Sequence, residues 1–253
     1  MKKSFMATFK KMKSFFLLFI VFLSCKLNAQ SNLHITPLTT NFYIFTTYQV
    51  VGGDLIPSNS MYLVTNEGVV LFDTPWDSTQ TQPLLDTIMA RHNKKVIMSI
   101  STHYHDDRTE GLSYLASKGV KTYSSKKTYI LGKANNEDTA QHYFYNDTTF
   151  VVGNYTFQTY YPGEGHTADN IVVWFPLQKV LYGGCFVKST ESPSIGYVGN
   201  ANLATWKKSV KNVEHRFKHP AYIIPGHYSW ESTKSLRYTK KLIRKYNRTN
   251  KLK

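Results

Sequence analysis

Two histidines and an aspartate lie close together in the segment STHYHDDRTEG, residues 101–111. His103 and His105 are separated by one residue, and Asp107 follows two positions later. Imidazole and carboxylate are zinc ligands, and a His-x-His pair in a tight loop can direct both rings at one ion. A polar surface loop is the competing interpretation. The segment therefore raises the question of whether further ligands follow elsewhere in the chain.

Three later segments contain such ligands. His166 lies in PGEGHTADN, Cys185 in YGGCF and His227 in IIPGH, and each follows a stretch of strand-like sequence with glycines beside it. Glycine permits the tight turns that bring backbone close to an ion. Taken singly, each residue could belong to an ordinary loop or core, but four strand ends with a ligand each favour a metal centre. Asp107 can reach a second ion, and paired zinc ions can share a bridging water in hydrolases.

The strands and helices that must position these side chains can be read from the hydrophobic pattern. Aromatic and β-branched runs predict strands, whereas apolar residues at helical spacing predict helices. Each half of the chain begins with strands and then alternates strands with helices, which favours two packed sheets with helices outside. A hairpin loop is expected over residues 51–60. We expect strands at 42–50, 61–73, 95–102, 120–125, 148–153, 155–162, 170–176, 179–184 and 221–225, and helices at 81–92, 109–119, 126–136, 201–217 and from 231 onward.

The first 29 residues have the pattern of a secretory signal peptide. Lysines precede the apolar run SFFLLFIVFLS, which is too short to span a bilayer as a mature helix, and LNAQ offers a cleavage site after Ala29. We therefore expect a signal peptide at 1–29 and one domain at 30–253, exported to the periplasm. A lipid anchor at Cys25 is the rival interpretation. Cleavage leaves Cys185 as a lone thiol, which is either buried and inert or held by a metal.

The charge of the chain is concentrated at its two ends. The formal charge is +15, but six of the 31 basic residues lie within 1–29, which contains no acid. Nine of the other 25 basic residues lie in the last twenty positions, also without an acid, so the remainder, with 16 acids, is neutral. A nucleic-acid groove would spread positive charge over the body. We expect no nucleic-acid partner and no mature membrane span. An exported protein whose basic tail binds anionic envelope surfaces remains a possible alternative.

The motifs HYHDDR, PGEGHTADNIVVW, GGCFVKS and PGH, in this order and at these separations, resemble the metallo-β-lactamases of subclass B1. VVLFDTPWD at 69–77 is similar to the strand and turn that precede the first motif in that family, and the resemblance covers residues 33–247. It implies an αβ/βα sandwich with two zinc ions in a cleft at the edge of the sheets. Glyoxalase-type and RNA-processing relatives typically have histidine where this chain has Arg108. By the resemblance, His103, His105 and His166 bind one zinc, and Asp107, Cys185 and His227 bind the other.

The resemblance implies a monomeric β-lactamase that opens the ring amide of penicillins, cephalosporins and carbapenems, and so confers antibiotic resistance. We expect hydroxide formed at the zinc centre to attack the lactam carbonyl, with Asp107 orienting it. Hydrolysis of a lactone or thioester is the alternative activity. Lys188 matches the family lysine that binds the substrate carboxylate. The apolar residues Val51, Leu55 and Ile56 match its mobile flap over the substrate.

Three positions depart from the family pattern. Glu110 stands where glycine is usual, and the sequence predicts an extra carboxylate close to the metals there. Tyr197 stands near a position often held by asparagine and is expected to contact the substrate. Asn200 replaces a common aspartate. None of the three removes a ligand, so these departures bear on the choice of substrate rather than on the activity.

Overall fold

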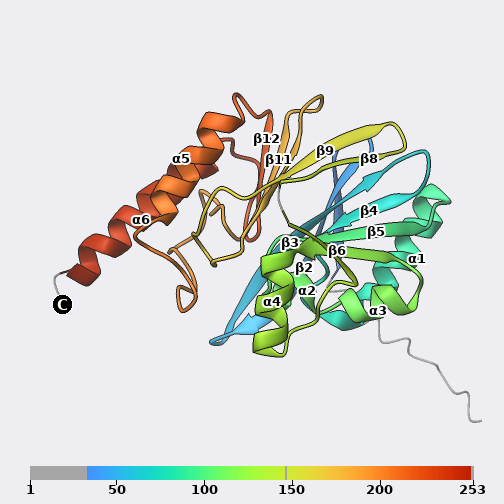
Figure 1. Ribbon diagram of the computed structural model, residues 1–253, viewed down its shortest axis with the longest axis horizontal. Coiled ribbons are helices and arrows are strands. Elements are labelled where there is room, and N and C mark those ends of the chain that lie inside the picture. The colour runs from blue at the N-terminus through green and yellow to red at the C-terminus, as the bar shows by residue number, and fades with distance from the viewer. Residues whose placement is uncertain (1–32, 146, 252–253) are drawn as a thin grey trace, which may run out of the picture. The chain divides into compact units, whose positions relative to one another are not determined.

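The computed structural model describes residues 33–145 and 147–251. Two mixed β-sheets pack face to face, and helices cover their outer faces, so the predicted αβ/βα sandwich is confirmed (Figure 1). The predicted signal peptide at 1–29 and Cys25 lie outside the described residues. Among the described helices, none is long and apolar enough to cross a membrane.

The first sheet has seven strands in sequence order. Its first four strands pair antiparallel, whereas β4 to β7 pair parallel, and helical connections join these parallel strands. The carboxyl ends of β5 and β6 therefore open at the same edge of the sheet. The strands are β1 (His34–Thr39), β2 (Phe42–Val51), β3 (Asp54–Val64), β4 (Val69–Phe72), β5 (Val96–Ser101), β6 (Lys121–Ser125) and β7 (His142–Phe144).

The second sheet has five strands in the order β12-β11-β10-β9-β8. Strands β8 to β11 form antiparallel pairs, and β12 adds to β11 in parallel. The parallel pair places the ends of β11 and β12 side by side. The strands are β8 (Thr149–Val152), β9 (Tyr155–Tyr160), β10 (Val172–Phe175), β11 (Val180–Gly184) and β12 (Tyr222–Pro225).

Helices cover both outer faces of the sandwich. Leu84, Ile88 and Leu115 of α1 and α3 pack on the first sheet, whereas α5 and α6 pack on the second through residues such as Trp206 and Ile243. The helical elements are η1 (Ser78–Gln80), α1 (Thr81–His92), α2 (Asp106–Thr109), α3 (Leu112–Ser117), α4 (Lys126–Asn135), α5 (Trp206–Arg216) and α6 (Ser235–Lys251).

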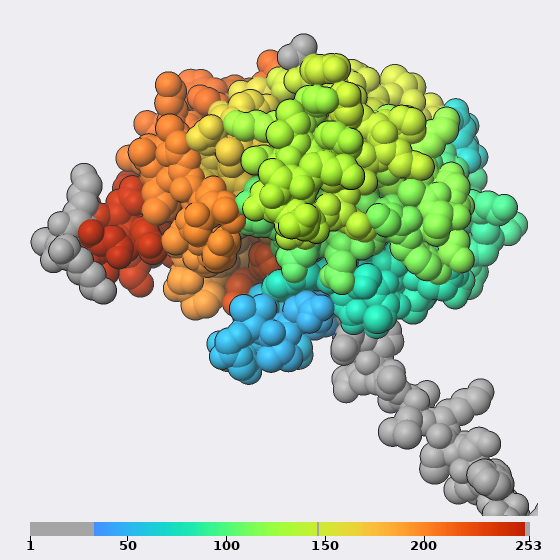
Figure 2. Space-filling model, turned by 60° about the horizontal axis from the view of Figure 1, so that its bottom comes forward, coloured from blue at the N-terminus to red at the C-terminus, as the bar shows by residue number. Residues whose placement is uncertain are grey.

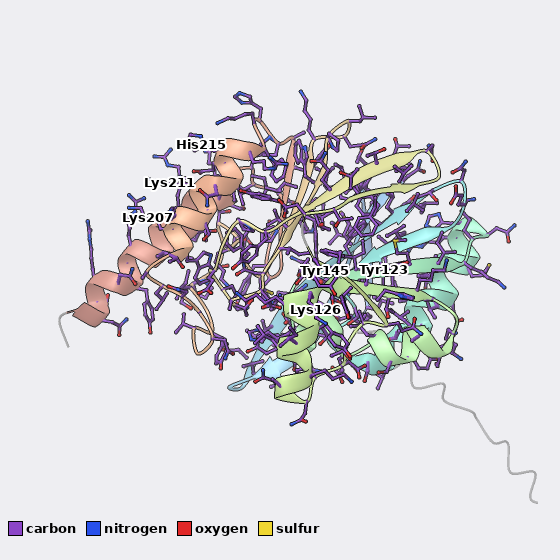
Figure 3. The ribbon with its side chains drawn as sticks, in the orientation of Figure 1. Tyr123, Lys126, Tyr145, Lys207, Lys211 and His215 are labelled. Atoms are coloured by element: carbon purple, nitrogen blue, oxygen red, sulfur yellow. The ribbon has the colours of Figure 1, made fainter. Side chains whose placement is uncertain are left out.

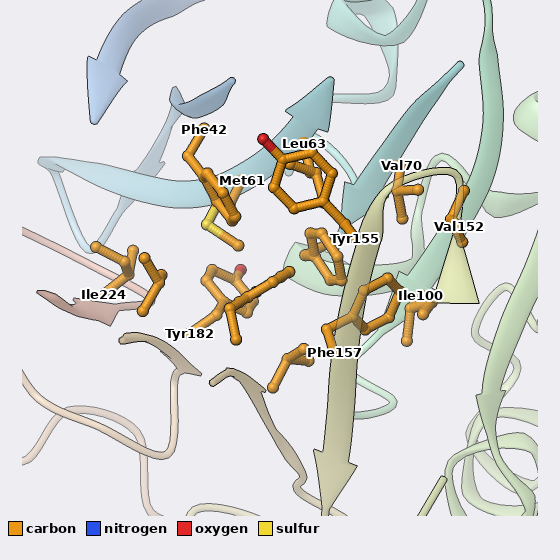
Figure 4. Packing of buried hydrophobic residues seen from close by; sticks show 14 of the residues in the cluster. Phe42, Met61, Leu63, Val70, Ile100, Val152, Tyr155, Phe157, Tyr182 and Ile224 are labelled. Carbon is orange, nitrogen blue, oxygen red and sulfur yellow. The ribbon is translucent and has the colours of Figure 1, made fainter. Parts of the chain in front are cut away.

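An aromatic core fills the space between the two sheets. Phe72 of the first sheet meets Phe157 and Phe175 of the second edge to face, with ring centroids 5.1 and 5.2 Å apart. Figure 4 shows Phe157 among the other buried side chains of this cluster. All three rings are fully buried. Burying one such side chain contributes about 1.5–3 kcal/mol, and edge-to-face pairs add to this. The core therefore fixes how the sheets sit against one another.

The hairpin between β2 and β3 differs from the prediction. The expected loop over 51–60 is mostly strand, because β3 begins at Asp54 and pairs with β2 as far as Val51. Only Gly52 and Gly53 form the turn, with φ values of 61° and 92°. A tight two-residue hairpin turn of this kind needs positive φ at both positions, which glycine adopts without strain. The tip of the hairpin, at Gly52 and Gly53, thus lies at the end of two long paired strands.

Other predicted boundaries also shift. The strand expected over 61–73 is broken by a turn at 65–68 and forms parts of two strands, and the short edge strands β1 and β7 were not predicted. Helix α5 begins at Trp206 rather than at 201. Asn202 explains this, because its side-chain oxygen accepts from the backbone N of Thr205 and its carbonyl accepts from Trp206 N.

Candidate metal centre

The predicted ligands come together at one edge of the sandwich. His103 and His105 follow β5, His166 follows β9, Cys185 follows β11 and His227 follows β12. Asp107 lies in the single turn of α2 directly after the histidine pair. All six predicted residues are therefore neighbours, although the chain between the first and the last of them runs from residue 103 to residue 227.

Asp107, Cys185 and His227 form one compact group. The Oδ2 atom of Asp107 lies 3.1 Å from Cys185 Sγ and 3.2 Å from His227 Nε2. The Cys185 sulfur lies 3.3 Å from the same nitrogen of His227. One donor atom from each residue thus surrounds a single point, which is the arrangement that a tetrahedral ion requires from three protein ligands.

The three histidines form a second group. The ring centroids of His103, His105 and His166 lie 4.8, 4.9 and 5.1 Å apart in pairs. His103 Nε2 lies 3.2 Å from His105 Nδ1. The tightest sets of donor atoms, within 4.8 Å, join His103 with His105 and Asp107, and His103 with His166 and Cys185. The two groups therefore adjoin one another at His103 rather than standing apart.

Outer hydrogen bonds orient two of the rings. His227 Nδ1 lies 2.7 Å from the carbonyl oxygen of Pro57, and a carbonyl only accepts, so this nitrogen carries the proton. The Nε2 lone pair of His227 is then free to face Cys185 and Asp107. In the same way His105 Nε2 lies 3.0 Å from Asn200 Oδ1, which leaves Nδ1 free. Such outer partners fix the tautomer of a metal-binding histidine.

Burial sets the ionisation of the remaining groups. Burial, with the charges of neighbouring basic groups, holds the pKa of His103 and His166 well below the ordinary value, so both rings are neutral. Burial opposes ionisation of Asp107, but Arg108 beside it holds the pKa of that carboxyl well below its usual range. The neutral rings offer lone pairs, and the carboxylate offers negative charge.

The donor set fits zinc. Burial raises the pKa of the Cys185 thiol, and its proton donates to Asp107 at 3.1 Å. A coordinating metal ion deprotonates such a thiol outright. The buried Nδ1 of His166 has no hydrogen-bond partner among the described residues. Neutral imidazoles, one thiolate and one carboxylate are the ligands that zinc prefers, and hard cations such as Mg²⁺ would disfavour the sulfur.

Arg108 holds the site together and was not predicted to do so. Its guanidinium is fully buried and donates to the carbonyl oxygens of Asn59 at 2.6 Å and Gly226 at 2.9 Å. It also pairs with Asp107 at 2.9 Å and lies 3.6 Å from Asp73. Burial raises the pKa of Asp73 to about 6. Arg108 thus ties β3, the turn before His227 and Asp107 to one another. In the sequence, Arg108 only distinguished this chain from the glyoxalase-type and RNA-processing relatives.

A cleft of about 650 Å³ opens over the two groups. Its wall contains the four predicted substrate contacts, Lys188, Val51, Ile56 and Tyr197, whereas Leu55 does not line it and is exposed. His105, Asp107, His166 and His227 are reached from the cleft, while His103 and Cys185 lie beneath its floor. The tip of the β2–β3 hairpin projects from the body beside this region (Figure 2).

Some cleft residues were missed by the sequence analysis, and one prediction was wrong. Trp76 lines the cleft, lies edge to face with His227 at 5.6 Å and donates to Asp106 at 3.2 Å. Glu137 also lines it, and burial raises the pKa of its carboxyl. Glu110, expected beside the metals, does not line the cleft. Its carboxylate instead accepts from Ser78 Oγ at 3.0 Å.

Comparison with known proteins agrees with this geometry. Residues 53–242 match the family model described as the metallo-beta-lactamase superfamily. The chain is 44% identical over 217 residues to metallo-beta-lactamase type 2 of Elizabethkingia meningoseptica, covering 86% of this chain and 87% of the relative. It is 42% identical to metallo-beta-lactamase IND-1 of Chryseobacterium indologenes, covering 83% and 87%.

A solved structure is also similar. The metallo-beta-lactamase from Pontibacter korlensis superimposes with a TM-score of 0.82 at 34% identity, covering 84% of this chain and 99% of that one. The family model spans most of the chain, and the first of these relatives is 44% identical over 86% of this chain and 87% of its own length. The chain therefore belongs to the metallo-beta-lactamase superfamily, and the resemblance to subclass B1 is confirmed.

Proposed function

We propose that this protein is an exported β-lactamase that hydrolyses the ring amide of penicillins, cephalosporins and carbapenems with two zinc ions, and so confers antibiotic resistance. The supporting observation is the convergence of six zinc-type ligands, with the Asp107 carboxylate between both groups, beneath a cleft of about 650 Å³. The names of the relatives support the reaction class. We propose that His103, His105 and His166 hold one zinc, and Asp107, Cys185 and His227 the other.

Zinc held by these residues would supply Lewis-acid catalysis and make a nucleophile from water at neutral pH. Asp107 is the protein group best placed to orient that water. Its Oδ1 lies 3.8 Å from His103 Nε2 and its Oδ2 3.2 Å from His227 Nε2, so one carboxylate reaches both groups. As an ionised carboxylate, it would accept a hydrogen bond from water in the cleft. No side-chain nucleophile is needed.

Lys188 would bind the carboxylate that these lactams carry. Its side chain is buried on the wall of the cleft, and its ammonium lies 5.4 Å over the ring of Trp206. Its backbone N donates to Thr239 of α6 at 2.8 Å, so that helix fixes where the lysine starts. Burial lowers the pKa of Lys188. Burial removes water from this cation, and an anionic substrate group would give it a partner of opposite charge.

The hairpin tip would cover the apolar side of the substrate. Val51 and Ile56 line the cleft, and the exposed Val51 and Leu55 lie on either side of the two-glycine turn. Tyr197 adds an aromatic ring to the cleft wall and lies edge to face with His105 at 5.8 Å. Apolar walls with few polar groups are typical of small-molecule sites. A bound lactam would bury the exposed apolar surface of the tip.

We further propose that residues 1–29 are a signal peptide and that 30–253 form the mature domain, which acts as a monomer in the periplasm without nucleic acid. The leader pattern supports export. The alternative anchor is a lipid on Cys25. A mass spectrum of the exported protein distinguishes the two, because cleavage gives an N-terminus at Gln30 and lipidation adds the mass of the acyl chains to Cys25.

Hydrolysis assays with residues 30–253 test the function. A penicillin and a carbapenem are followed by absorbance with zinc, with a chelator, and with zinc restored after chelation. We expect turnover that the chelator stops and zinc restores. Zinc content measured on the same samples should give two ions per chain. A protein that holds two zincs and turns over no lactam would refute the proposal. Assays with a lactone and a thioester would then test the alternative hydrolase activity.

A further inference from the structure

Helix α6 presents a row of cations to solvent. Arg244 and Lys245 each lie three or four residues from both Lys241 and Arg248, which places these four cations on one face of the helix. All four side chains are exposed, and together with Thr249 they line a shallow groove of about 450 Å³. We name these four cations the basic face of α6.

Buried apolar residues on the opposite side of α6 hold the basic face towards solvent. Leu236, Leu242 and Ile243 are buried against the second sheet and α5. The helix therefore cannot roll to hide its cations, and its apolar side is not free to enter a membrane. Whatever binds the basic face must do so through charge at the surface of a fixed helix.

The protein does not neutralise the basic face. Of the basic side chains of α6 that the structure describes, Lys240 forms an ion pair, with Glu214 of α5. Within the basic face, Arg244 donates to the carbonyl of Lys240 and Lys241 lies 5.6 Å over the Tyr238 ring, and neither contact supplies negative charge. Like charges four residues apart destabilise a helix. The last turns favour cations through the helix dipole, but that effect fades within one turn and does not account for Lys241.

The neighbouring helix extends the positive charge. Lys207 and Lys211 of α5 lie one turn apart and project from the outer side of that helix, which packs beside α6 (Figure 3). Glu214 of α5 is already paired with Lys240. Outside the last twenty positions, the proposed mature chain has 16 bases and 16 acids. Its net positive charge therefore comes from the α6 end of the sequence.

We propose that the basic face of α6 docks the protein on the surface of a bilayer that contains anionic phospholipid. A row of exposed ammonium and guanidinium groups along one helix face matches a plane of phosphate headgroups. Single-stranded nucleic acid would need aromatic side chains for stacking, and the groove is lined by none. Because no apolar side chain inserts, binding is electrostatic and falls with salt.

Sedimentation with vesicles tests the docking. Residues 30–253 are mixed with vesicles containing about 30% phosphatidylglycerol in phosphatidylcholine at about 10 mM salt, and with pure phosphatidylcholine vesicles. We expect binding to the anionic vesicles alone, and loss of binding at about 0.5 M salt. Each cation near such a surface is worth roughly a fivefold change in affinity. The variant K241Q/R244Q/K245Q/R248Q should therefore bind on the order of 600-fold more weakly.

A matched control separates position from net charge. K95Q/K118Q/K121Q/K133Q removes four exposed lysines from the α1–α4 side of the molecule and changes the net charge equally. We expect it to bind anionic vesicles almost as tightly as the unmodified protein. Equal losses in the two variants, or no binding at low salt, would overturn the proposal. Tighter binding to a single-stranded oligonucleotide than to vesicles would also overturn it and would identify another polyanion as partner. Circular dichroism checks that both variants remain folded.

Discussion

Cys185 is the side chain whose chemistry depends most on a metal. It is fully buried, its thiol pKa is raised by burial, and its sulfur lies within 3.3 Å of both Asp107 and His227. A buried thiol in such a place packs as a small apolar group when neutral and binds zinc tightly when deprotonated. Substitutions here should therefore separate metal binding from folding.

Cys185→Ser keeps the volume and removes the soft ligand. Loss of an outer hydrogen-bond partner of a metal ligand typically costs roughly 10–100-fold in affinity, and loss of a ligand itself should cost more. We expect the zinc content after dialysis to fall from two ions towards one, while circular dichroism stays unchanged. Two tightly held zincs in the variant would contradict the assignment of Cys185 as a ligand.

Lys188→Ala should act on substrate binding rather than on the metal. Removing the buried cation from the cleft wall leaves the substrate carboxylate without a partner, and hydrogen bonds to charged groups contribute about 1.5–3 kcal/mol. We expect KM for a penicillin to rise by roughly tenfold or more, with zinc content unchanged. Lys118→Ala, an exposed lysine after α3, is the control and should leave KM unaltered. An unchanged KM for Lys188→Ala would contradict the role.

At the scale of elements, the β2–β3 hairpin presents apolar side chains to solvent. Val50, Val51 and Leu55 are 68, 50 and 61% exposed, which is unusual for apolar residues on paired strands. Exposed apolar patches of this kind mark binding surfaces. Since these side chains contribute little to the core, their replacement should alter binding without altering stability.

The double variant Val51→Ser and Leu55→Ser tests the hairpin. We expect KM for lactams to rise several-fold, because the tip loses its apolar contacts with substrate, while the free energy of unfolding changes by less than about 0.5 kcal/mol. Leu177→Ser is the control, since Leu177 is 81% exposed in a turn between β10 and β11 and does not line the cleft. A KM equal to that of the unmodified protein would show that the hairpin does not contact substrate.

Removal of residues 248–253 tests whether the end of α6 contributes to catalysis. The residues that anchor the helix, Leu242 and Ile243, remain after this truncation, and Lys188 still meets Thr239. We therefore expect lactam hydrolysis to be unchanged. A truncated protein that is folded and inactive would show that the tail belongs to the catalytic apparatus.

The sequence predicted an element well where its structure depends on neighbouring residues, and poorly where it depends on pairing with a distant segment. Helix α1 begins and ends at 81 and 92 as predicted, because its apolar spacing is unambiguous. The run VGGDLIPSNS was read as a loop, since glycine, proline and serine favour turns, yet pairing with β2 makes most of it strand. The six candidate ligands could be picked out of the sequence because five of them follow strand ends and Asp107 lies two residues after His105. Glu110 was misplaced, since sequence gives neighbours along the chain and not the direction of a side chain in space.

At the scale of the whole molecule, Arg108 joins parts that are distant in sequence. Its guanidinium contacts Asn59 of β3 and Gly226 after β12, and it pairs with Asp107. A buried charge that loses its partner is costly, because water no longer stabilises it. Arg108 is therefore one of the side chains that join the two sheets at the cleft, together with Asn59 and Tyr182, and no spacing pattern in the sequence reveals this role.

Arg108→Met should destabilise the protein strongly. Asp107 and Asp73 would remain buried without their cation, and breaking a buried pair on one side costs about 3–5 kcal/mol. Denaturant unfolding of the metal-free protein measures this loss directly, free of any effect of zinc. Arg237→Met on the exposed side of α6 is the control and should change the free energy of unfolding by less than about 0.5 kcal/mol. A loss for Arg108→Met as small as that of the control would contradict the role of Arg108.

The spread of the ligands along the chain bears on when the protein can acquire its metal. His103 lies in the first half of the sequence, and His227 reaches the centre only after β12 has paired with β11. On the proposed export route, a polypeptide threaded unfolded through a translocation pore would lack this strand pairing and so would carry no assembled centre with it. The ions would then be taken up in the compartment where the last strand docks. The supply of zinc on that side of the membrane would set how much of the enzyme matures.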